Sequence, residues 1–156
     1  VQIDGTDQIE CWDAFRVARR DAPRGVRWQR TEAGAVFEGR FDGYQLRLGD
    51  DLSHQRRIEV DTDDRIIYVE DRIKGQGAHC VESRIHLHPE VEVCRKRDCF
   101  RVWRGSKQAR IEVKRSEVRR ERGWYCPRFG VRRRICVLVV KANASLPARL
   151  SYRIRY

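Results

Sequence analysis

Two histidines stand two residues apart in the segment His86-Leu87-His88. Alternate residues of an extended strand point to the same face, so this spacing offers two imidazole ligands to a metal such as zinc. A complete site needs a third ligand, and no second pair of His or Cys has ligand spacing. His86 and His88 are therefore the candidate metal ligands. The alternative is that they make hydrogen bonds at the end of a strand that Pro89 terminates.

The six cysteines, the serines and the other histidines supply no recognisable nucleophile or base. Cys94 and Cys99 could flank a hairpin turn and pair with each other, but the sequence does not choose among the possible disulfides. No Cys stands in a catalytic signature with a His, and no Ser lies in a Gly-x-Ser-x-Gly elbow. His54 and His79 show no relation to the His86 pair. The residues therefore supply no candidate catalytic group, and the redox compartment stays open.

Two clusters of carboxylates have the ligand chemistry that calcium prefers. One is Asp50-Asp51, next to a glycine, and the other is the segment 61–64, which follows a strand-like run. Aspartates in such places are also the residues of hairpin turns. Both interpretations stay open.

The positive charge of the chain is concentrated in one segment. The 156 residues carry 34 Lys and Arg against 23 Asp and Glu, a net charge of +11. Residues 95–134 alone hold 16 basic and 4 acidic residues, so the rest of the chain is nearly neutral. Aromatic residues interleave with these arginines, which suits a polyanionic partner. Three interpretations remain, namely an acidic polysaccharide, a nucleic acid, or a solvated strand face; nucleic acid is disfavoured because no known binding motif is present.

The elements that must position these residues are strands. Apolar and charged residues alternate with the two-residue period of half-buried strands, for example at Val26 and Trp28 or at Ile58 and Val60. Continuous apolar runs at 66–69 and 135–140 indicate central strands covered on both sides. With turn residues every eight to fifteen positions, the sequence predicts an all-β fold, an antiparallel β-sandwich of about a dozen short strands.

The chain is expected to form one sandwich domain over residues 1–156, with no linker or repeat. No apolar run is long enough to cross a membrane, the longest being residues 135–140. The sequence contains no Met and enters a strand pattern directly at Val1-Gln2-Ile3. We therefore expect a truncated part of a larger protein, the alternative being removal of an initiator Met. No signal-peptide pattern is present in these residues.

Seven short segments follow one another in an order that resembles the C-terminal β-sandwich of heparinase II/III-like polysaccharide lyases. They are VQIDGTDQ (1–8), FRVARRDAP (15–23), FDGY (41–44), HQRRI (54–58), VEDRIKG (69–75), HLHP (86–89) and GWYCPRFG (123–130). Each segment alone is unspecific, but their order and spacing extend over nearly the whole chain. The resemblance implies the same sandwich fold that the periodicity predicts.

The resemblance also implies an activity for the parent protein. Such enzymes cleave acidic, uronate-containing polysaccharides by β-elimination, with residues of an N-terminal α/α toroid and of the first sandwich strands. In several members the latter hold zinc. These family segments would all precede Val1, so no catalytic residue is carried over to this chain, and any zinc would be bound upstream. His86 and His88 match a family segment whose implied role is structural.

Three hypotheses follow for function and setting. In the first, the chain is the C-terminal sandwich of a lyase, inactive alone, with a catalytic toroid in cis and an acidic polysaccharide as substrate of the parent. In the second, it is a non-catalytic basic module that binds acidic glycans; the third and least favoured is a nucleic-acid-binding β-domain. The resemblance implies a periplasmic or exported protein, whereas the residues leave a cytoplasmic one open. Missing first strands would expose an edge or an apolar face, so we expect the isolated chain to self-associate.

Overall fold

The computed structural model describes residues 1–13, 16–49, 51–97, 99–114 and 116–156. These residues form fifteen strands and one four-residue helix, and every strand pair is antiparallel. The predicted all-β sandwich is confirmed. No helix in the described ranges is long and apolar enough to span a bilayer. Phe15, Asp50 and Arg115, which belong to the family segment, the carboxylate cluster and the basic segment named above, lie outside the described residues.

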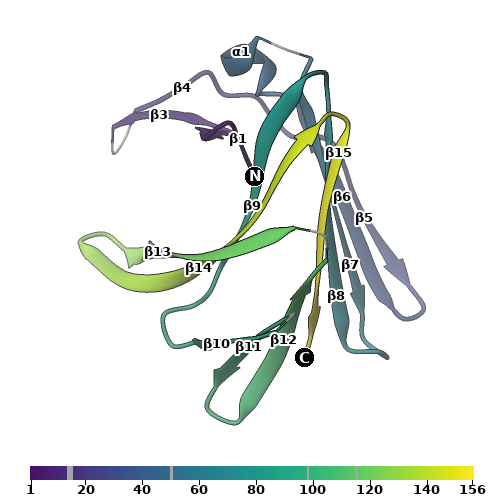
Figure 1. Cartoon of the computed structure of the whole chain (residues 1–156), viewed down its shortest axis with the longest axis vertical. Helices are drawn as coiled ribbons and strands as arrows, with labels where there is room; N and C mark the ends of the chain where they lie inside the picture. Colours follow the sequence, from purple (N-terminus) through teal and green to yellow (C-terminus); the bar gives the residue numbers. More distant parts are fainter. Residues whose placement is uncertain (14–15, 50, 98, 115) are drawn as a thin grey trace.

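Two sheets and a separate hairpin contain the strands (Figure 1). The five-stranded sheet has the order β13 (Glu117–Arg128), β14 (Val131–Ser145), β9 (Ala78–His86), β1 (Gln2–Ile3) and β2 (Thr6–Asp7). The eight-stranded sheet has the order β10 (Glu92–Lys96), β11 (Cys99–Arg104), β12 (Lys107–Val113), β15 (Ala148–Arg155), β8 (Ile66–Lys74), β7 (Ser53–Asp61), β6 (Gly34–Phe41) and β5 (Arg24–Thr31). Strands β3 (Glu10–Asp13) and β4 (Arg16–Ala18) form the hairpin, and α1 (Gln45–Leu48) joins β6 to β7.

The core lies between the two large sheets. Leu138 and Val140 of β14 belong to one buried cluster with Ile73 of β8 and Leu150 of β15. The intervening Val137 and Val139 point to the opposite face of β14 and are buried in a second, smaller cluster. The prediction of a strand covered on both sides at residues 135–140 is thus confirmed. Strand β8 lies in the interior of its sheet, but within 66–69 only Val69 is buried, so the expected coverage of both faces is not found there.

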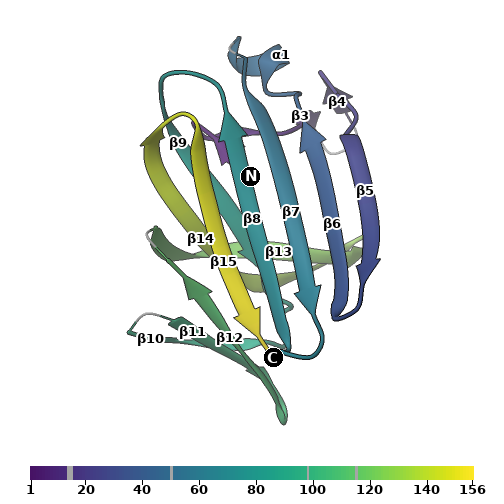
Figure 2. The ribbon, with the colours of Figure 1, turned by 90° about the vertical axis from the view of Figure 1, so that its right-hand side faces the viewer.

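The sheet edge at β5 departs from the expected alternation. Val26 and Trp28 were expected on a dry face, yet they are 55% and 66% exposed, and the prediction is wrong there. Trp28 stands in the same register row as the buried Val69 and Tyr152, so it faces the inner side of the eight-stranded sheet. The opposing sheet ends in β1 and β2, which are two residues long. Figure 2 shows β5 and β6 at the edge of the eight-stranded sheet, away from β8 and β15.

A long two-stranded arm extends from the five-stranded sheet. Strand β14 pairs with β9 only from Val137 to Ser145, whereas residues 131–135 pair with β13 alone. Figure 1 shows this β13–β14 arm curving away from the eight-stranded sheet. Gly123 lies on the face of the arm that carries Ile135 and Val137, and a Cβ atom there would come within 2.7 Å of Val137 Cγ2. Glycine therefore permits the close approach that the curvature requires.

Turn chemistry accounts for the second carboxylate cluster. Residues 61–64 lie at the end of β7 and in the turn to β8, where Asp61 Oδ1 accepts a 2.8 Å hydrogen bond from the Asp64 backbone N–H. This bond is the local side-chain contact by which Asp stabilises turns. The hairpin interpretation therefore describes this segment, and among the described residues no group of three or more His, Cys, Asp or Glu is placed to hold a metal ion.

Candidate functional site

The two predicted metal ligands do not share a strand face. His86 is the last residue of β9 and is exposed, and His88 lies beyond it in the loop to β10. His88 Nδ1 accepts a 3.3 Å hydrogen bond from the Glu90 backbone N–H, and its ring packs edge-on against Tyr125 with centroids 5.2 Å apart. Within the described ranges, no group of three or more His, Cys, Asp or Glu is placed to hold a metal ion. The residues present therefore do not fit a zinc site, and His88 follows the alternative of hydrogen bonding at a strand end.

A different histidine is at the centre of the most buried polar cluster. His54 of β7 is 4% exposed, and its Nε2 lies 2.7 Å from Asp71 Oδ1 on β8. Arg56, two residues along β7 and opposite Asp71, donates from Nε to Oδ1 at 2.7 Å and from Nη2 to Oδ2 at 2.9 Å. Ser83 of the opposing sheet donates its hydroxyl to Asp71 Oδ2 at 2.6 Å. One carboxylate thus joins both sheets through four hydrogen bonds.

The charge states in this cluster follow from burial and its compensation. Burial alone would raise the pKa of Asp71, but the hydrogen bonds from His54 and Arg56 and the Arg56 charge hold it well below its usual range. Burial lowers the pKa of His54, against the pull of Asp71, so the imidazole is neutral at pH 7. A neutral ring donates from Nε2 to Asp71 and accepts at Nδ1 from the Gln8 amide nitrogen, 3.0 Å away.

The His54–Asp71 pair does not have the setting of an acid–base catalyst. Both ring nitrogens and both carboxylate oxygens are occupied by partners from the protein, and Asp71 has no exposed surface. The cluster instead ties β7, β8 and β9 to the N-terminal segment through Gln8. Sequence reasoning gave His54 no role, although two ionisable residues at alternate positions of one strand, His54 and Arg56, share a face and are a signal that could have marked it.

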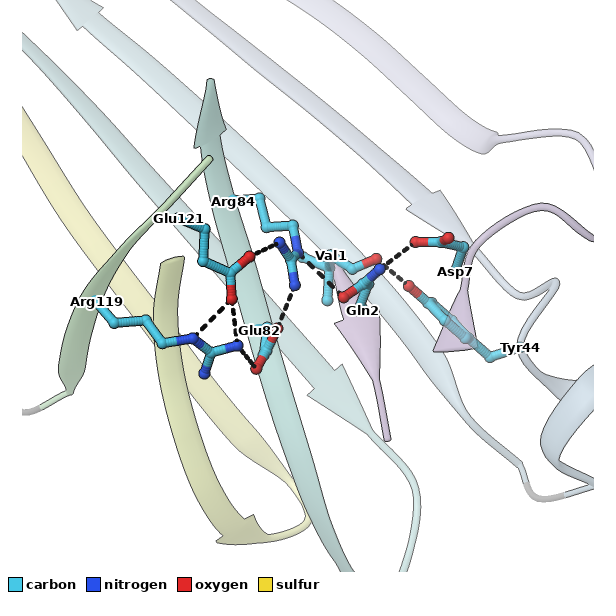
Figure 3. A network of polar contacts seen from close by, with 8 residues as sticks. All are labelled: Val1, Gln2, Asp7, Tyr44, Glu82, Arg84, Arg119 and Glu121. Atoms are coloured by element: carbon cyan, nitrogen blue, oxygen red, sulfur yellow. Dashed lines mark hydrogen bonds and ion pairs between the residues drawn. The ribbon is translucent and has the colours of Figure 1, made fainter. Parts of the chain in front are cut away.

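A second polar cluster lies on the outer face of the five-stranded sheet (Figure 3). Arg84 of β9 contacts Glu121 Oε2 at 2.6 Å and Glu82 Oε2 at 2.7 Å. Arg119 of β13 completes a closed arrangement, with Nη2 2.8 Å from Glu82 Oε1 and 2.7 Å from Glu121 Oε1. The hydrogen bonds from Arg84 and Arg119 lower the pKa of Glu121. Two positive and two negative groups neutralise each other, so this Arg–Glu quartet offers no net charge to a ligand.

The quartet and α1 together anchor the N-terminal strand. Arg84 Nε donates to Gln2 Oε1 at 3.0 Å, and Gln2 Nε2 donates to Asp7 Oδ1 at 2.5 Å. The buried Tyr44, just before α1, donates its hydroxyl to the Val1 carbonyl oxygen at 2.5 Å (Figure 3). The first residues of the chain are therefore fixed by side chains from β9 and from the β6–α1 connection.

The basic segment divides into neutralised and unpaired arginines. Arg104 lies 2.5 Å from Glu90, and Arg119 belongs to the quartet. The exposed arginines of the β13–β14 arm have no ion pair among the described residues; they are Arg120, Arg122, Arg128, Arg132, Arg133 and Arg134. Two of them, Arg132 and Arg134, lie over the Trp124 ring at 4.3 and 3.9 Å from its centroid. The arm thus carries a large share of the net positive charge of the segment, with seven Arg against two Glu over residues 117–134.

The cysteines do not form disulfides in this structure. All six are free thiols. Cys94 and Cys99 do lie on the two strands of the predicted hairpin, but Cys94 stands opposite Arg101 and Cys99 opposite Lys96. The hairpin is confirmed, and the pairing that it suggested is not formed.

Comparison with known proteins gives one family and one fold. The family model for "Heparinase II/III-like, C-terminal" matches residues 1–153. The heparan sulfate lyase HepC from Pedobacter heparinus superposes with a TM-score of 0.70 at 13% identity, over 85% of this chain and 21% of that enzyme. A heparinase III structure superposes with a TM-score of 0.58 at 13% identity, over 83% of this chain and 20% of that one. No curated protein sequence matches the chain. The chain therefore spans about a fifth of the length of the enzymes whose fold it shares.

Proposed function

The chain belongs to the heparinase II/III-like, C-terminal family, and we propose that it is the C-terminal β-sandwich of a lyase that cleaves acidic, uronate-containing polysaccharide by β-elimination. The family match over residues 1–153 is the observation that carries this proposal. In such a reaction the uronate carboxylate is neutralised, a base removes the proton at C5, and an acid protonates the leaving glycosidic oxygen. The catalytic groups belong to a toroid domain and to strands upstream of Val1.

The state of the buried polar groups supports an upstream location for the catalytic groups. A general acid or base must come within hydrogen-bond reach of the substrate. Asp71 is fully buried and bonded to His54, Arg56 and Ser83, and the Arg–Glu quartet is neutralised internally. The role of this chain is then to hold the upstream strands in place through the anchored N-terminal segment.

Zinc, if the parent enzyme uses it, is bound by residues upstream of Val1. The described part of this chain brings no third ligand to His86 or His88. A protein exported to the periplasm or beyond would meet acidic polysaccharides of other organisms, and this is the location we propose.

The test is a comparison of the full-length parent protein with the 156-residue chain on heparan sulfate, heparin, chondroitin sulfate and alginate. The unsaturated uronide that β-elimination leaves absorbs in the ultraviolet, so product formation can be followed directly. We expect activity in the parent and none in the chain alone. Activity in the chain alone would refute the upstream location, and a parent inactive on every polymer would refute the lyase function.

One observation favours a second candidate, a non-catalytic module that binds acidic glycans. Apart from Arg119, the arginines of the β13–β14 arm have no ion pair among the described residues, as expected for a polyanion-binding surface. A parent gene without a toroid domain, together with binding to acidic glycans, would favour this module over the lyase.

A further inference from the structure

The outer part of the β13–β14 arm is a two-stranded ribbon with few supports. From Gly123 to Ile135 the two strands hydrogen-bond only with each other, and β9 pairs with β14 only from Val137 onward. The ring contact between His88 and Tyr125 is one of its few connections to the rest of the chain. An isolated two-stranded ribbon is marginally stable in water. The composition of its faces therefore has a direct influence on whether it stays folded.

One face of this ribbon changes from apolar to basic along its length. On β14, Leu138 and Val140 face the core, and the same side further out carries Arg134 and Arg132. On β13, Trp124 stands opposite Arg134, and Arg122 precedes it on the same side. We call the group Arg120, Arg122, Trp124, Arg132 and Arg134 the arginine face. It begins where the strand leaves the core.

The charges of the arginine face are uncompensated. Residues 117–134 contain seven arginines and two acidic residues, Glu117 and Glu121, and Glu121 is already bound by Arg84 and Arg119. Like charges gathered on one face repel each other and lower the stability of the folded form. The quartet on the opposite face has one Glu for each Arg. The quartet is therefore neutral, whereas the arginine face carries a net positive charge.

Trp124 arranges two of these arginines. Both guanidinium groups lie within 4.5 Å of its ring centroid, at 4.3 Å for Arg132 and 3.9 Å for Arg134. Stacking on an aromatic ring limits the rotamers of an arginine while leaving its N–H donors at the edge of the guanidinium plane. The pair is therefore held ready to bind carboxylate or sulfate groups by two-pronged hydrogen bonds.

We propose that the arginine face binds a chain of acidic polysaccharide, with Arg132 and Arg134 each holding a carboxylate or sulfate group. The choice of polymer rests on the proposed function. It also has support on the arm itself, because nucleic-acid binders use open aromatic rings for base stacking, and the Trp124 ring already has two guanidinium groups against it. Alternate residues of a strand are about 7 Å apart, so the arginines form a ladder along which a chain with repeated anionic groups can lie.

The experiment measures binding of heparan sulfate and of alginate to the full-length parent and to the 156-residue chain at several salt concentrations. The double variant Arg132→Ser/Arg134→Ser is compared with Arg20→Ser/Arg30→Ser, which removes the same charge from exposed sites outside the arm. We expect the arm variant to bind about tenfold more weakly or worse, with a shallower salt dependence, and the control to bind nearly as the wild type. Equal losses in both variants would overturn the proposal.

A conservative variant separates guanidinium geometry from charge and keeps the test valid if the serine variant unfolds. Arg132→Lys/Arg134→Lys retains both charges but loses the two-pronged donors. We expect it to bind several-fold more weakly than the wild type at unchanged net charge. Binding equal to the wild type would overturn the assigned role of the arginine pair. Duplex and single-stranded DNA are titrated in parallel, and DNA binding as tight as polysaccharide binding, with the same dependence on Arg132 and Arg134, would overturn the choice of polymer.

The lyase assay distinguishes this proposal from the proposed function. A parent that is active, yet binds polysaccharide equally well with and without the arm substitutions, would refute the arginine face alone. A parent that is inactive on every polymer, yet loses binding in the arm variant, would refute the lyase function and retain the arginine face.

Discussion

Asp71 is the residue on which most of the internal polar contacts converge. It lies on β8 with no exposed surface and accepts hydrogen bonds from three side chains, His54 and Arg56 of β7 and Ser83 of β9. Buried ion pairs contribute little net stability when complete, because desolvation offsets their attraction, but removal of one partner leaves a buried charge unpaired. The Asp71 cluster therefore determines which strands pack together more than it adds to the total free energy of folding.

Asp71→Asn should destabilise the chain by about 3–5 kcal/mol, because Arg56 would be left half-buried without its counter-charge. Urea unfolding followed by circular dichroism measures this difference. The control is Asp63→Asn, an exposed turn residue, whose effect should stay within about 0.5 kcal/mol. An Asp71→Asn protein as stable as the wild type would show that Arg56 finds water or another acceptor.

At the residue level, the sequence predicted which segments belong to the family pattern but not which of their side chains contact one another. The segments HQRRI and VEDRIKG were recognised as parts of a family pattern, but the pattern does not say that His54, Arg56 and Asp71 meet. Their contact depends on a register that places Arg56 opposite Asp71, and on Ser83 arriving from the other sheet. Such long-range pairing is invisible to local periodicity, whereas the local spacing of His86 and His88 was visible and proved uninformative.

At the level of elements, periodicity was sufficient to predict strands and insufficient to predict their exposure. The apolar runs at 66–69 and 135–140 became central strands as expected. The same alternation in β5 leaves Val26 and Trp28 exposed, because burial depends on whether another layer lies above the strand. The outer residues of the β13–β14 arm are exposed for the same reason, because they extend beyond β9 and no further layer among the described residues covers them.

We expect the curvature of the arm to depend on Gly123. A Cβ atom at this position would lie 2.7 Å from Val137 Cγ2 and 3.2 Å from Ile135 Cγ1, closer than such atoms normally approach. Gly123→Ala should therefore force the ribbon to open and destabilise the chain by about 1–3 kcal/mol, the usual cost of overpacking. Gly39→Ala is the control, since its nearest contact would be an ordinary 3.6 Å.

Thermal unfolding gives the overall effect, and hydrogen exchange locates it. Loss of protection should concentrate on the β13 and β14 amides in Gly123→Ala and be absent in Gly39→Ala. Equal behaviour of the two variants would mean that the close approach at Gly123 does not set the curvature.

At the scale of the whole molecule, the chain has one well-formed sandwich and one uncovered side. The inner face of the eight-stranded sheet is covered by β9 and β14 at its centre, but the opposing sheet ends in the two-residue strands β1 and β2. Trp28 and Val26 are exposed on the part of this inner face that the opposing sheet does not cover. In the proposed parent enzyme, we expect strands upstream of Val1 to extend the five-stranded sheet and to cover these side chains.

The isolated chain should therefore self-associate through this uncovered face. Sedimentation velocity over a range of concentrations measures the association, and burial of exposed apolar surface is the driving force. Trp28→Gln should shift the chain towards monomer, because Trp28 is the largest exposed apolar group on that face. The control is Phe129→Ser, which removes a 93% exposed ring at the tip of the arm and should leave the association unchanged.

In a parent protein that includes the upstream strands, Trp28→Gln should not change the association, because those strands would bury Trp28 within the same chain. If the chain stays monomeric at all concentrations, the exposed face is stable in contact with water. The proposal that upstream strands normally cover this face would then be refuted.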